Sequence, residues 1–206
     1  MLKILGRATS TNVQKVLWFC DDQGRDYDHD NDIGGAFGRN DTPEYLAMNP
    51  NGRVPVVIDG AHVMWESNSI IRYLARQSKS ELYPSDFAAR QIVERWMDWE
   101  LSLLAPRHVP MFIGMVRTKP EDRNQAAMDA ALVQWNAAMQ ILDDQLAENA
   151  YVAGETFTLA DIPIAPIAHR WFNLDIDRIE APNIKRWYAS FSGNAAFEKW
   201  VDIELA

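Results

Sequence analysis

Cysteine is almost absent from this sequence: Cys20 is the only one among 206 residues. One cysteine cannot form a disulfide within the chain or a cysteine-based zinc site, so a hydrophobic core must hold the fold together. Such cysteine usage is typical of a reducing compartment, and we expect a cytoplasmic protein. Cys20 falls on the apolar stripe of a predicted helix, where we interpret it as a small buried hydrophobe.

Long hydrophobic runs are missing as well. The longest, residues 162–168, is broken by prolines and is far shorter than the ~20 residues of a membrane span. The N-terminal sequence MLKILGR lacks the apolar segment of a secretory signal, because Lys3, Gly6 and Arg7 interrupt it. We therefore expect no membrane association and no export by that route.

Positive charge is scarce relative to negative charge. Lys plus Arg number 20 against 29 Asp plus Glu, which gives a net charge of −9, and no basic patch is visible in the sequence. Such a surface repels nucleic acid, which we exclude as a partner. The histidines are scattered without metal-ligand spacing, so we also expect no metal; they are His29, His62, His108 and His169.

The composition changes character along the chain. Residues 1–78 alternate strand-like and helix-like periods in the order β-α-β-α-β-β-α, whereas residues 86–206 show only helical periodicity. Residues 78–87 carry the turn signals of a linker. The sequence therefore predicts a small α/β domain over residues 1–78, followed by an all-α domain over residues 86–206.

Several element boundaries follow from local patterns. In the first domain we expect a strand at residues 1–6, a helix at 12–22, and a hairpin over 56–65 with an Asp59-Gly60 turn. Ser67 should cap the next helix. In the second domain Pro106 and Pro110 should kink or divide a long helix, and another should start at Pro120.

Three polar features should meet at one end of the predicted sheet. The first is the turn from Ala8 to Asn12, whose hydroxyls and amide lie beside a helix N-terminus that would stabilise a thiolate or another anion. Simple capping of that helix explains the turn equally well. The sequence leaves both interpretations open.

The other two features are Val54-Pro55 and Glu66-Ser67. Val54-Pro55 precedes a strand, and a cis bond there would present unpaired backbone groups to a peptide-like ligand, although an ordinary edge proline is the simpler interpretation. Glu66-Ser67 offers an acid for an ammonium group and a hydroxyl with free N–H groups for a carboxylate. Capping alone would again account for Ser67.

Four motifs, in this order and spacing, resemble the bacterial soluble glutathione transferases. They are S-x-N-x-x-K-V from Ser10, NPNGRVP over 49–55, ES-x-x-I-x-x-Y-L from Glu66, and G-x-x-F-T-x-A-D from Gly154. The resemblance covers essentially the whole chain and points to the theta, zeta and nu-like serine branch. It implies a thioredoxin-like N-terminal domain, a C-terminal helical bundle, a homodimer and a role in detoxification.

The resemblance also implies roles for individual residues. Ser10 and Asn12 are similar to the groups that activate the sulfur of glutathione, the co-substrate, with Thr9 as a fallback. Val54, before Pro55, is similar to the residue that pairs with the cysteinyl unit. Of the remaining positions, Glu66 and Ser67 match those at the γ-glutamyl end and Arg53 one near the glycyl end.

The second substrate, a small hydrophobic electrophile, should bind against the helix after the linker. We expect its pocket to be formed by His108, Met111, Phe112 and Met115. The same residues would serve equally well as interhelical core or as a dimer contact.

Three functions are compatible with the sequence. The first is transfer of glutathione to electrophiles, and the second is glutathione-dependent disulfide or peroxide reduction, as in nu-like relatives. The third is a non-catalytic binding protein with the same fold. The turn after the first strand contains no tyrosine and no cysteine, which disfavours mechanisms that use either residue there.

Overall fold

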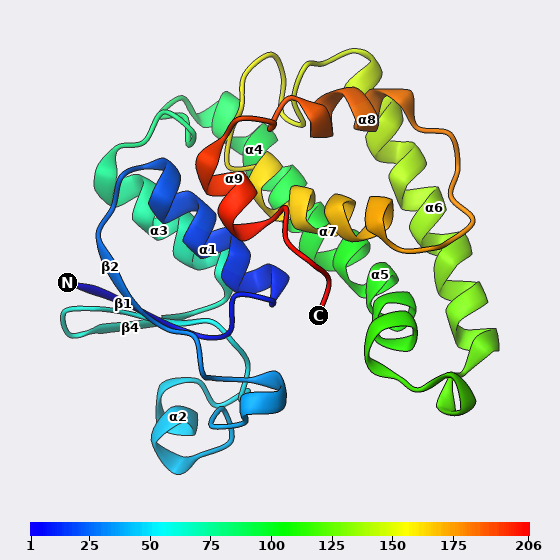
Figure 1. Cartoon of the computed structure of the whole chain (residues 1–206). Helices are drawn as coiled ribbons and strands as arrows, with labels where there is room; N and C mark the ends of the chain where they lie inside the picture. The colour runs from blue at the N-terminus through cyan, green and yellow to red at the C-terminus, as the bar shows by residue number, and fades with distance from the viewer.

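The computed structural model describes residues 1–206, and its N-terminal part is a four-stranded sheet with helices on both sides (Figure 1). The sheet order is β2-β1-β3-β4, in which β2 runs parallel to β1 and the other neighbours are antiparallel. The strands are β1 (Leu2–Leu5), β2 (Tyr27–Asp30), β3 (Val56–Asp59) and β4 (His62–Trp65). The helices are α1 (Thr11–Asp22), α2 (Pro43–Met48) and α3 (Ser67–Ser78). This order matches the predicted β-α-β-α-β-β-α pattern.

Two local predictions in this part need correction. Asp59 pairs with His62 in the hairpin register, so the turn consists of Gly60 and Ala61 and not of Asp59-Gly60. Gly60 supplies the positive φ, +62°, that such a turn requires. Ser67 does not cap α3 either, because it is the first helical residue and Glu66 occupies the capping position.

The C-terminal part is entirely helical. Its helices are α4 (Phe87–Trp99), α5 (Ala105–Phe112), α6 (Gln125–Ala147), α7 (Asp161–Asn173), α8 (Pro182–Ala189) and α9 (Ala195–Trp200). One π-helical turn, Glu100–Leu104, joins α4 to α5, and a second, Ile113–Arg117, follows α5, so the chain stays helical through both prolines. Pro120 starts only a short 3-10 turn, and α6 begins after Asn124, whose side chain caps it.

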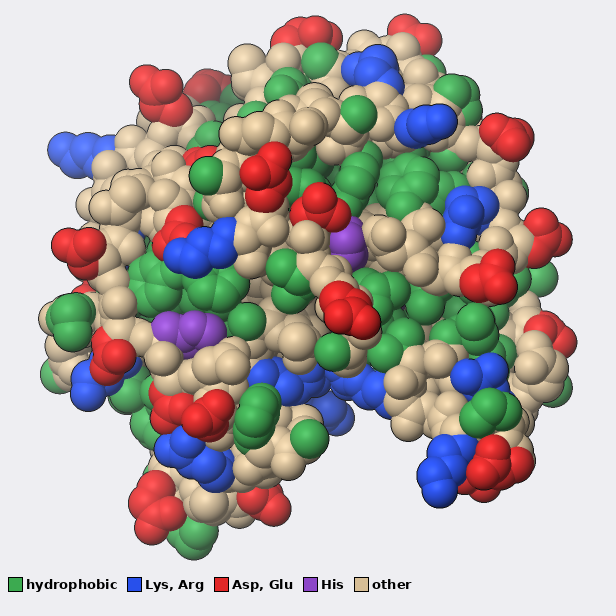
Figure 2. Space-filling view, viewed as in Figure 1, with side chains coloured by type: hydrophobic (Ala, Val, Ile, Leu, Met, Phe, Trp, Pro, Cys, Tyr) green, Lys and Arg blue, Asp and Glu red, His purple; other side chains and the backbone are tan.

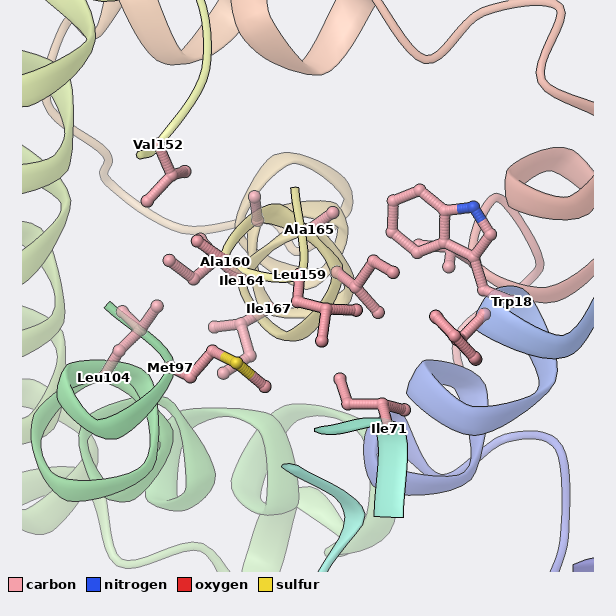
Figure 3. Packing of buried hydrophobic residues seen from close by; sticks show 14 of the residues in the cluster. Trp18, Ile71, Met97, Leu104, Val152, Leu159, Ala160, Ile164, Ala165 and Ile167 are labelled. Carbon is pink, nitrogen blue, oxygen red and sulfur yellow. The ribbon is translucent and has the colours of Figure 1, made fainter. Parts of the chain in front are cut away.

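One hydrophobic core runs through both parts of the molecule. It contains 44 buried residues, with α7 near its centre. Figure 3 shows Ile164, Ala165 and Ile167 of α7 packed between Met97 and Leu104 on one side and Trp18 and Ile71 on the other. Because one core holds the sheet domain and the helices together, residues at their junction have fixed positions.

The start of α7 is held by the predicted capping box. Thr158 Oγ1 accepts a hydrogen bond from the Ala160 N–H, and Asp161 Oδ2 accepts one from the Thr158 N–H. The buried Asp161 carboxylate also accepts from the Val152 N–H and from Trp187 Nε1. Asp161 therefore anchors the helix at the centre of the core. None of the helices is both long enough and apolar enough to cross a bilayer.

Candidate active site

A cavity of about 410 Å³ opens where the end of the sheet domain meets the π-helical turn after α4. It is lined by the three polar features that the sequence analysis placed together, Ser10 with Asn12, Val54 with Pro55, and Glu66 with Ser67. The remaining lining residues are Arg7, Gly34, Gly35, Asn40, Asn49, Gly52, Arg53 and Leu101. Polar groups from four separate segments thus converge on one hollow.

Ser10 lies at the N-terminus of α1 without capping it. Its hydroxyl makes no capping hydrogen bond, although its carbonyl oxygen accepts from the Val13 and Gln14 N–H groups. Asn12 is the second residue of the helix, and its Oδ1 accepts a hydrogen bond from Ser67 Oγ at 3.2 Å. The Ser10 hydroxyl and the Asn12 Nδ2 group are therefore free donors beside the positive end of a helix.

The Val54-Pro55 peptide bond is cis. Val54 lies outside β3, and neither its N–H nor its carbonyl oxygen has a hydrogen-bond partner in the protein. The loop before it is fixed, because the Arg53 carbonyl oxygen accepts from Tyr45 Oη at 2.8 Å and from Asn49 Nδ2 at 2.8 Å. The cavity therefore presents one unpaired backbone donor and one acceptor, as the edge of a β-strand would.

Glu66 and Ser67 form another wall of the cavity. Glu66 has a φ of +71°, and its exposed carboxylate does not cap α3. Ser67 is buried, and its hydroxyl is the donor to Asn12 described above. The first N–H groups of α3 remain available beside the Glu66 carboxylate, so this wall offers donors for a carboxylate and an acceptor for an ammonium group.

A buried ion pair lies beneath the site and joins the two parts of the chain. Lys15 Nζ donates to both carboxylate oxygens of Glu100, at 3.0 and 3.1 Å, and both side chains are 1% exposed. Asn68 Nδ2 donates to the same carboxylate at 3.1 Å. Lys15 is one turn after Asn12 and Asn68 follows Ser67, so this network holds the starts of α1 and α3 against the π-helical turn.

Thr9 is not brought to the cavity. Its hydroxyl accepts from Arg7 Nη1 at 2.7 Å, and its carbonyl oxygen accepts from Arg170 Nη2. Thr9 instead faces a small pocket closed by the C-terminal residues.

The four residues expected to bind an electrophile do not line the cavity either. His108, Met111 and Phe112 are only 3%, 3% and 1% exposed and lie between helices, while Met115 is half-buried against the core. Burial lowers the pKa of His108 to about 3, aided by the nearby charge of Arg170, so its imidazole is neutral and accepts from Arg170 Nη1 at 3.0 Å. This placement corresponds to the interhelical-core alternative, and a role in binding an electrophile stays a prediction.

Sequence reasoning missed several lining residues, of which Arg7 and Leu101 are the most informative. In the sequence Arg7 only interrupts an apolar segment. Its position immediately before the polar turn is the signal that could have identified it. Leu101 could not be singled out, because a leucine in a predicted long helix is expected in the hydrophobic core. It is 48% exposed here, and it is the cavity's only lining residue from the helical domain.

Two family models match this chain. The model described as "Glutathione S-transferase, N-terminal domain" matches residues 9–77, and "Glutathione S-transferase, C-terminal domain" matches residues 97–194. The chain is 38% identical to "Glutathione S-transferase GstB" of Escherichia coli strain K12 over 100% of both chains. It is 30% identical to "Glutathione S-transferase 3" of Zea mays, covering 97% of this chain and 93% of that protein.

A solved structure gives the same picture. The theta class glutathione S-transferase of Xanthomonas axonopodis pv. citri with glutathione bound superposes with a TM-score of 0.96 and 42% identity, covering 100% of this chain and 99% of that one. The poplar glutathione transferase F7 reaches 0.87 over 98% of both chains at 22% identity, which bears on the fold alone.

Proposed function

This chain belongs to the glutathione S-transferase family, and from that premise we propose that the cavity binds glutathione with its sulfur beside the Ser10 hydroxyl. The chain is an enzyme of that family, and glutathione is its co-substrate. What we add is a role for each cavity residue. The observation that carries the proposal is the free Ser10 hydroxyl at the start of α1, in the same cavity as the unpaired Val54 backbone.

Activation of the sulfur is assigned to Ser10 and Asn12. A thiol of pKa near ~8.5 is mostly protonated at neutral pH, whereas the nucleophile is the thiolate. The Ser10 Oγ–H and the Asn12 Nδ2–H groups donate to the negative sulfur, and the N-terminus of α1 adds a favourable electrostatic contribution. All three favour the thiolate over the thiol and so lower the pKa of the bound glutathione.

The rest of the tripeptide is assigned to the other walls. The Val54 N–H and carbonyl oxygen pair with the cysteinyl unit as an added strand would. Glu66 receives the γ-glutamyl ammonium group, and Ser67 with the first N–H groups of α3 receives its carboxylate. The exposed Arg53 guanidinium is assigned to the glycyl carboxylate, because Arg53 in the NPNGRVP motif matches a family position near the glycyl end. Each charged group of glutathione thus meets an opposite charge or a set of donors.

The reaction that follows is attack of the thiolate on a small hydrophobic electrophile. A carbon–sulfur bond forms, and the leaving group departs with its electron pair. The thiol proton has already been released to solvent. Leu101 is the apolar side chain that the helical domain contributes to the cavity rim.

The test is the thiolate absorbance of protein-bound glutathione against pH. We compare the wild type with Ser10→Ala, and the matched control is Thr11→Ala, which removes a neighbouring hydroxyl that does not line the cavity. We expect a depressed thiol pKa in the wild type and in Thr11→Ala. In Ser10→Ala the pKa should rise, and conjugation should slow roughly ten- to hundredfold, the value of a hydrogen bond to a charged group.

Other outcomes would overturn the assignment. Saturable binding with an unshifted thiol pKa in the wild type would remove the activation role, and faster turnover of a model disulfide than of an aryl halide would favour the reductase alternative. Absence of glutathione binding would favour a non-catalytic protein.

We also propose that the protein acts in detoxification as a cytoplasmic homodimer. Val63 and Trp65 on β4 are each 40% exposed, and this apolar surface supports a contact between copies. Sedimentation of the wild type and of Trp65→Glu tests it, because the variant should dissociate. A monomeric wild type would overturn it.

A further inference from the structure

One hydrogen bond joins the two helices whose first turns line the cavity. Ser67 Oγ, at the start of α3, donates to Asn12 Oδ1, at the start of α1, at 3.2 Å. Both residues line the cavity, although they are 55 positions apart in the chain. Ser67 is 5% exposed, and its hydroxyl makes no other hydrogen bond. The bond therefore connects the wall assigned to the γ-glutamyl end with the group assigned to the sulfur.

This bond decides which side of the Asn12 amide is free. A side-chain amide carries an acceptor oxygen on one side and a donor nitrogen on the other. Because Oδ1 is turned toward Ser67, the Nδ2–H group points away from Ser67 and keeps its donor capacity for a ligand. The opposite orientation would present the oxygen lone pairs to a negative sulfur, which would repel it. Only the observed orientation lets Asn12 stabilise a thiolate.

The charges around the cavity also favour an anion there. Three charged side chains line it, of which Arg7 and Arg53 are positive and Glu66 is negative. Figure 2 shows Lys and Arg side chains gathered at the notch between the lobe that carries α2 and the end of α5, although the net charge of the protein is −9. Nearby positive charge favours a thiolate over a neutral thiol. Asn12 is therefore needed in the cavity as a donor and not as an acceptor.

The buried network beneath the cavity holds Asn12 and Ser67 at this distance. Lys15 lies one turn after Asn12, and Asn68 directly follows Ser67. Both side chains donate to the Glu100 carboxylate, Lys15 at 3.0 Å and Asn68 at 3.1 Å. The starts of α1 and α3 are thus tied to one buried group, so the hydrogen bond between Ser67 and Asn12 has a fixed geometry.

We propose that Ser67 is a positioning residue for activation of the sulfur, because its hydroxyl holds the Asn12 amide with the donor side toward the thiolate. This inference rests on the proposed function, in which Asn12 donates to the sulfur of glutathione. A hydroxyl has a single proton to donate, and here Asn12 receives it. The γ-glutamyl carboxylate is then held by the first N–H groups of α3. Ser67 thus serves the carboxylate through its N–H group and the sulfur through its hydroxyl.

The test is a double-mutant cycle of Ser67→Ala and Asn12→Ala that measures the pKa of the bound glutathione thiol. The thiolate absorbance is recorded against pH at saturating glutathione, so that weaker binding does not change the result. The second measurement is the Kd of S-methylglutathione by calorimetry, because this thioether keeps the γ-glutamyl group but has no ionisable thiol. The matched control is Ser78→Ala, which removes a hydroxyl at the other end of α3 that bonds only to the Leu74 and Ala75 carbonyl oxygens.

Ser67→Ala should raise the thiol pKa by about 0.5 to 1 pH unit, the value of one hydrogen bond. Asn12→Ala should raise the thiol pKa by at least as much, and the double variant should match Asn12→Ala, because the Ser67 hydroxyl acts only through the Asn12 amide. The Kd of S-methylglutathione should change less than about threefold in Ser67→Ala, since the N–H groups that hold the carboxylate remain. Ser78→Ala should match the wild type in both measurements.

Three results would overturn the inference. The first is an unchanged thiol pKa in Ser67→Ala, and weaker binding of S-methylglutathione by the same variant would then assign the hydroxyl to the γ-glutamyl carboxylate. The second is additive pKa shifts in the double variant, which would mean that Ser67 acts without Asn12. The third is an equal shift in Ser78→Ala, which would make the effect a general loosening of α3. In each case a depressed wild-type pKa that Ser10→Ala raises keeps the proposed function, whereas an unshifted wild-type pKa overturns both.

Discussion

The two domains meet at two places where cations are buried, and these places differ in how the charge is balanced. In the first, which we call the paired region, Lys15 meets the Glu100 carboxylate with Asn68 beside it, and both charged side chains are 1% exposed. In the second, where the charges of Arg7 and Arg117 lie near Arg170, Arg170 is 7% exposed and has His108, the Thr9 carbonyl oxygen and the Phe112 ring as partners. The paired region therefore balances its cation with an acidic side chain, whereas Arg170 is stabilised by polar and aromatic partners.

The two regions differ in how a buried cation is stabilised. A satisfied buried pair resists replacement of either partner but offers nothing to a ligand. A buried arginine without an acidic partner is held by its hydrogen bonds and by the face of an aromatic ring. Lys15 belongs to α1, and Arg170 donates to the Thr9 carbonyl oxygen, so both cations connect the Ser10 turn with the helical domain.

Removing one half of the paired region should have the largest effect. Glu100→Ala leaves Lys15 charged and buried without a partner, and we expect a loss of about 3–5 kcal/mol in the free energy of unfolding. Urea denaturation measures it. The double variant Lys15→Met/Glu100→Leu should recover most of the loss, because it removes both charges. A single-variant loss below about 1 kcal/mol would mean that water reaches the pair.

Gly6→Ala should act on the cavity without touching the paired region. A Cβ at Gly6 would lie 2.8 Å from Val13 Cγ2 and 2.8 Å from Val54 Cβ, so Val54 must move. We expect a destabilisation of about 1–3 kcal/mol from overpacking, together with weaker glutathione binding by calorimetry. Gly24→Ala is the control, since Gly24 also has a positive φ but nothing within 4 Å of its Cβ position. Its binding should match the wild type, and equal binding in Gly6→Ala would contradict the role of Val54.

Acid should destabilise the protein through His108, which accepts a hydrogen bond from Arg170. Its pKa is lowered to about 3 in the folded protein by burial and by Arg170, with a smaller contribution from Lys15, and is near ~6.5 when unfolded. The unfolded chain therefore binds more protons between these values, so this stability is present above pH ~6.5 and is lost as the pH falls toward 3. One such proton changes the unfolding free energy by at most about 1.4 kcal/mol per pH unit.

The measurement is the difference in unfolding free energy between the wild type and His108→Asn from pH 7 to pH 4. Asp161, whose pKa burial raises to about 6, acts in the opposite direction and is present in both proteins, so it cancels in the difference. The wild type should lose stability more steeply with acid. Parallel pH profiles would show that His108 is protonated without cost.

The exposed ion pair between Arg39 and Asp30 should contribute least to the free energy of unfolding. Arg39 Nη2 lies 3.0 Å from Asp30 Oδ2, but the two side chains are 54% and 34% exposed. Solvent and salt screen such a pair, and Arg39→Gln should change the unfolding free energy by less than about 1 kcal/mol in urea denaturation. A loss close to that of Glu100→Ala would remove burial as the explanation of the difference between pairs.

The sequence was most informative where a residue's role depends on its near neighbours. The hairpin over 56–65 and the capping box at Asp161 are set by residues a few positions apart, and both are present. Ser10, Val54 and Glu66 were expected at one place because each lies at the end of an element that belongs to one sheet domain. The order of strands and helices in this domain followed from the alternation of strand-like and helix-like periods.

The sequence could not predict features that depend on packing between residues far apart in the chain. The helical pattern of α5 does not say which face meets α6 and α7, so the sequence left His108 and Phe112 open between a pocket wall and interhelical core, and both side chains are buried. The charges of Arg7, Arg117 and Arg170 affect one another in the folded protein. Arg117 and Arg170 are more than 100 residues from Arg7 in the chain, so no local pattern shows this proximity. The capping position of α3 went to Glu66, and Ser67 turned toward Asn12 on another helix.

The burial of Cys20 determines which sulfur can react in this protein. Its side chain is 0% exposed within α1, and burial raises the pKa of its thiol to about 12. At neutral pH the Cys20 side chain is therefore a buried thiol and not a thiolate. If the proposed reaction takes place in the cavity, the reacting sulfur is therefore the one that glutathione brings, and Cys20 is out of reach of both alkylation and mixed-disulfide formation.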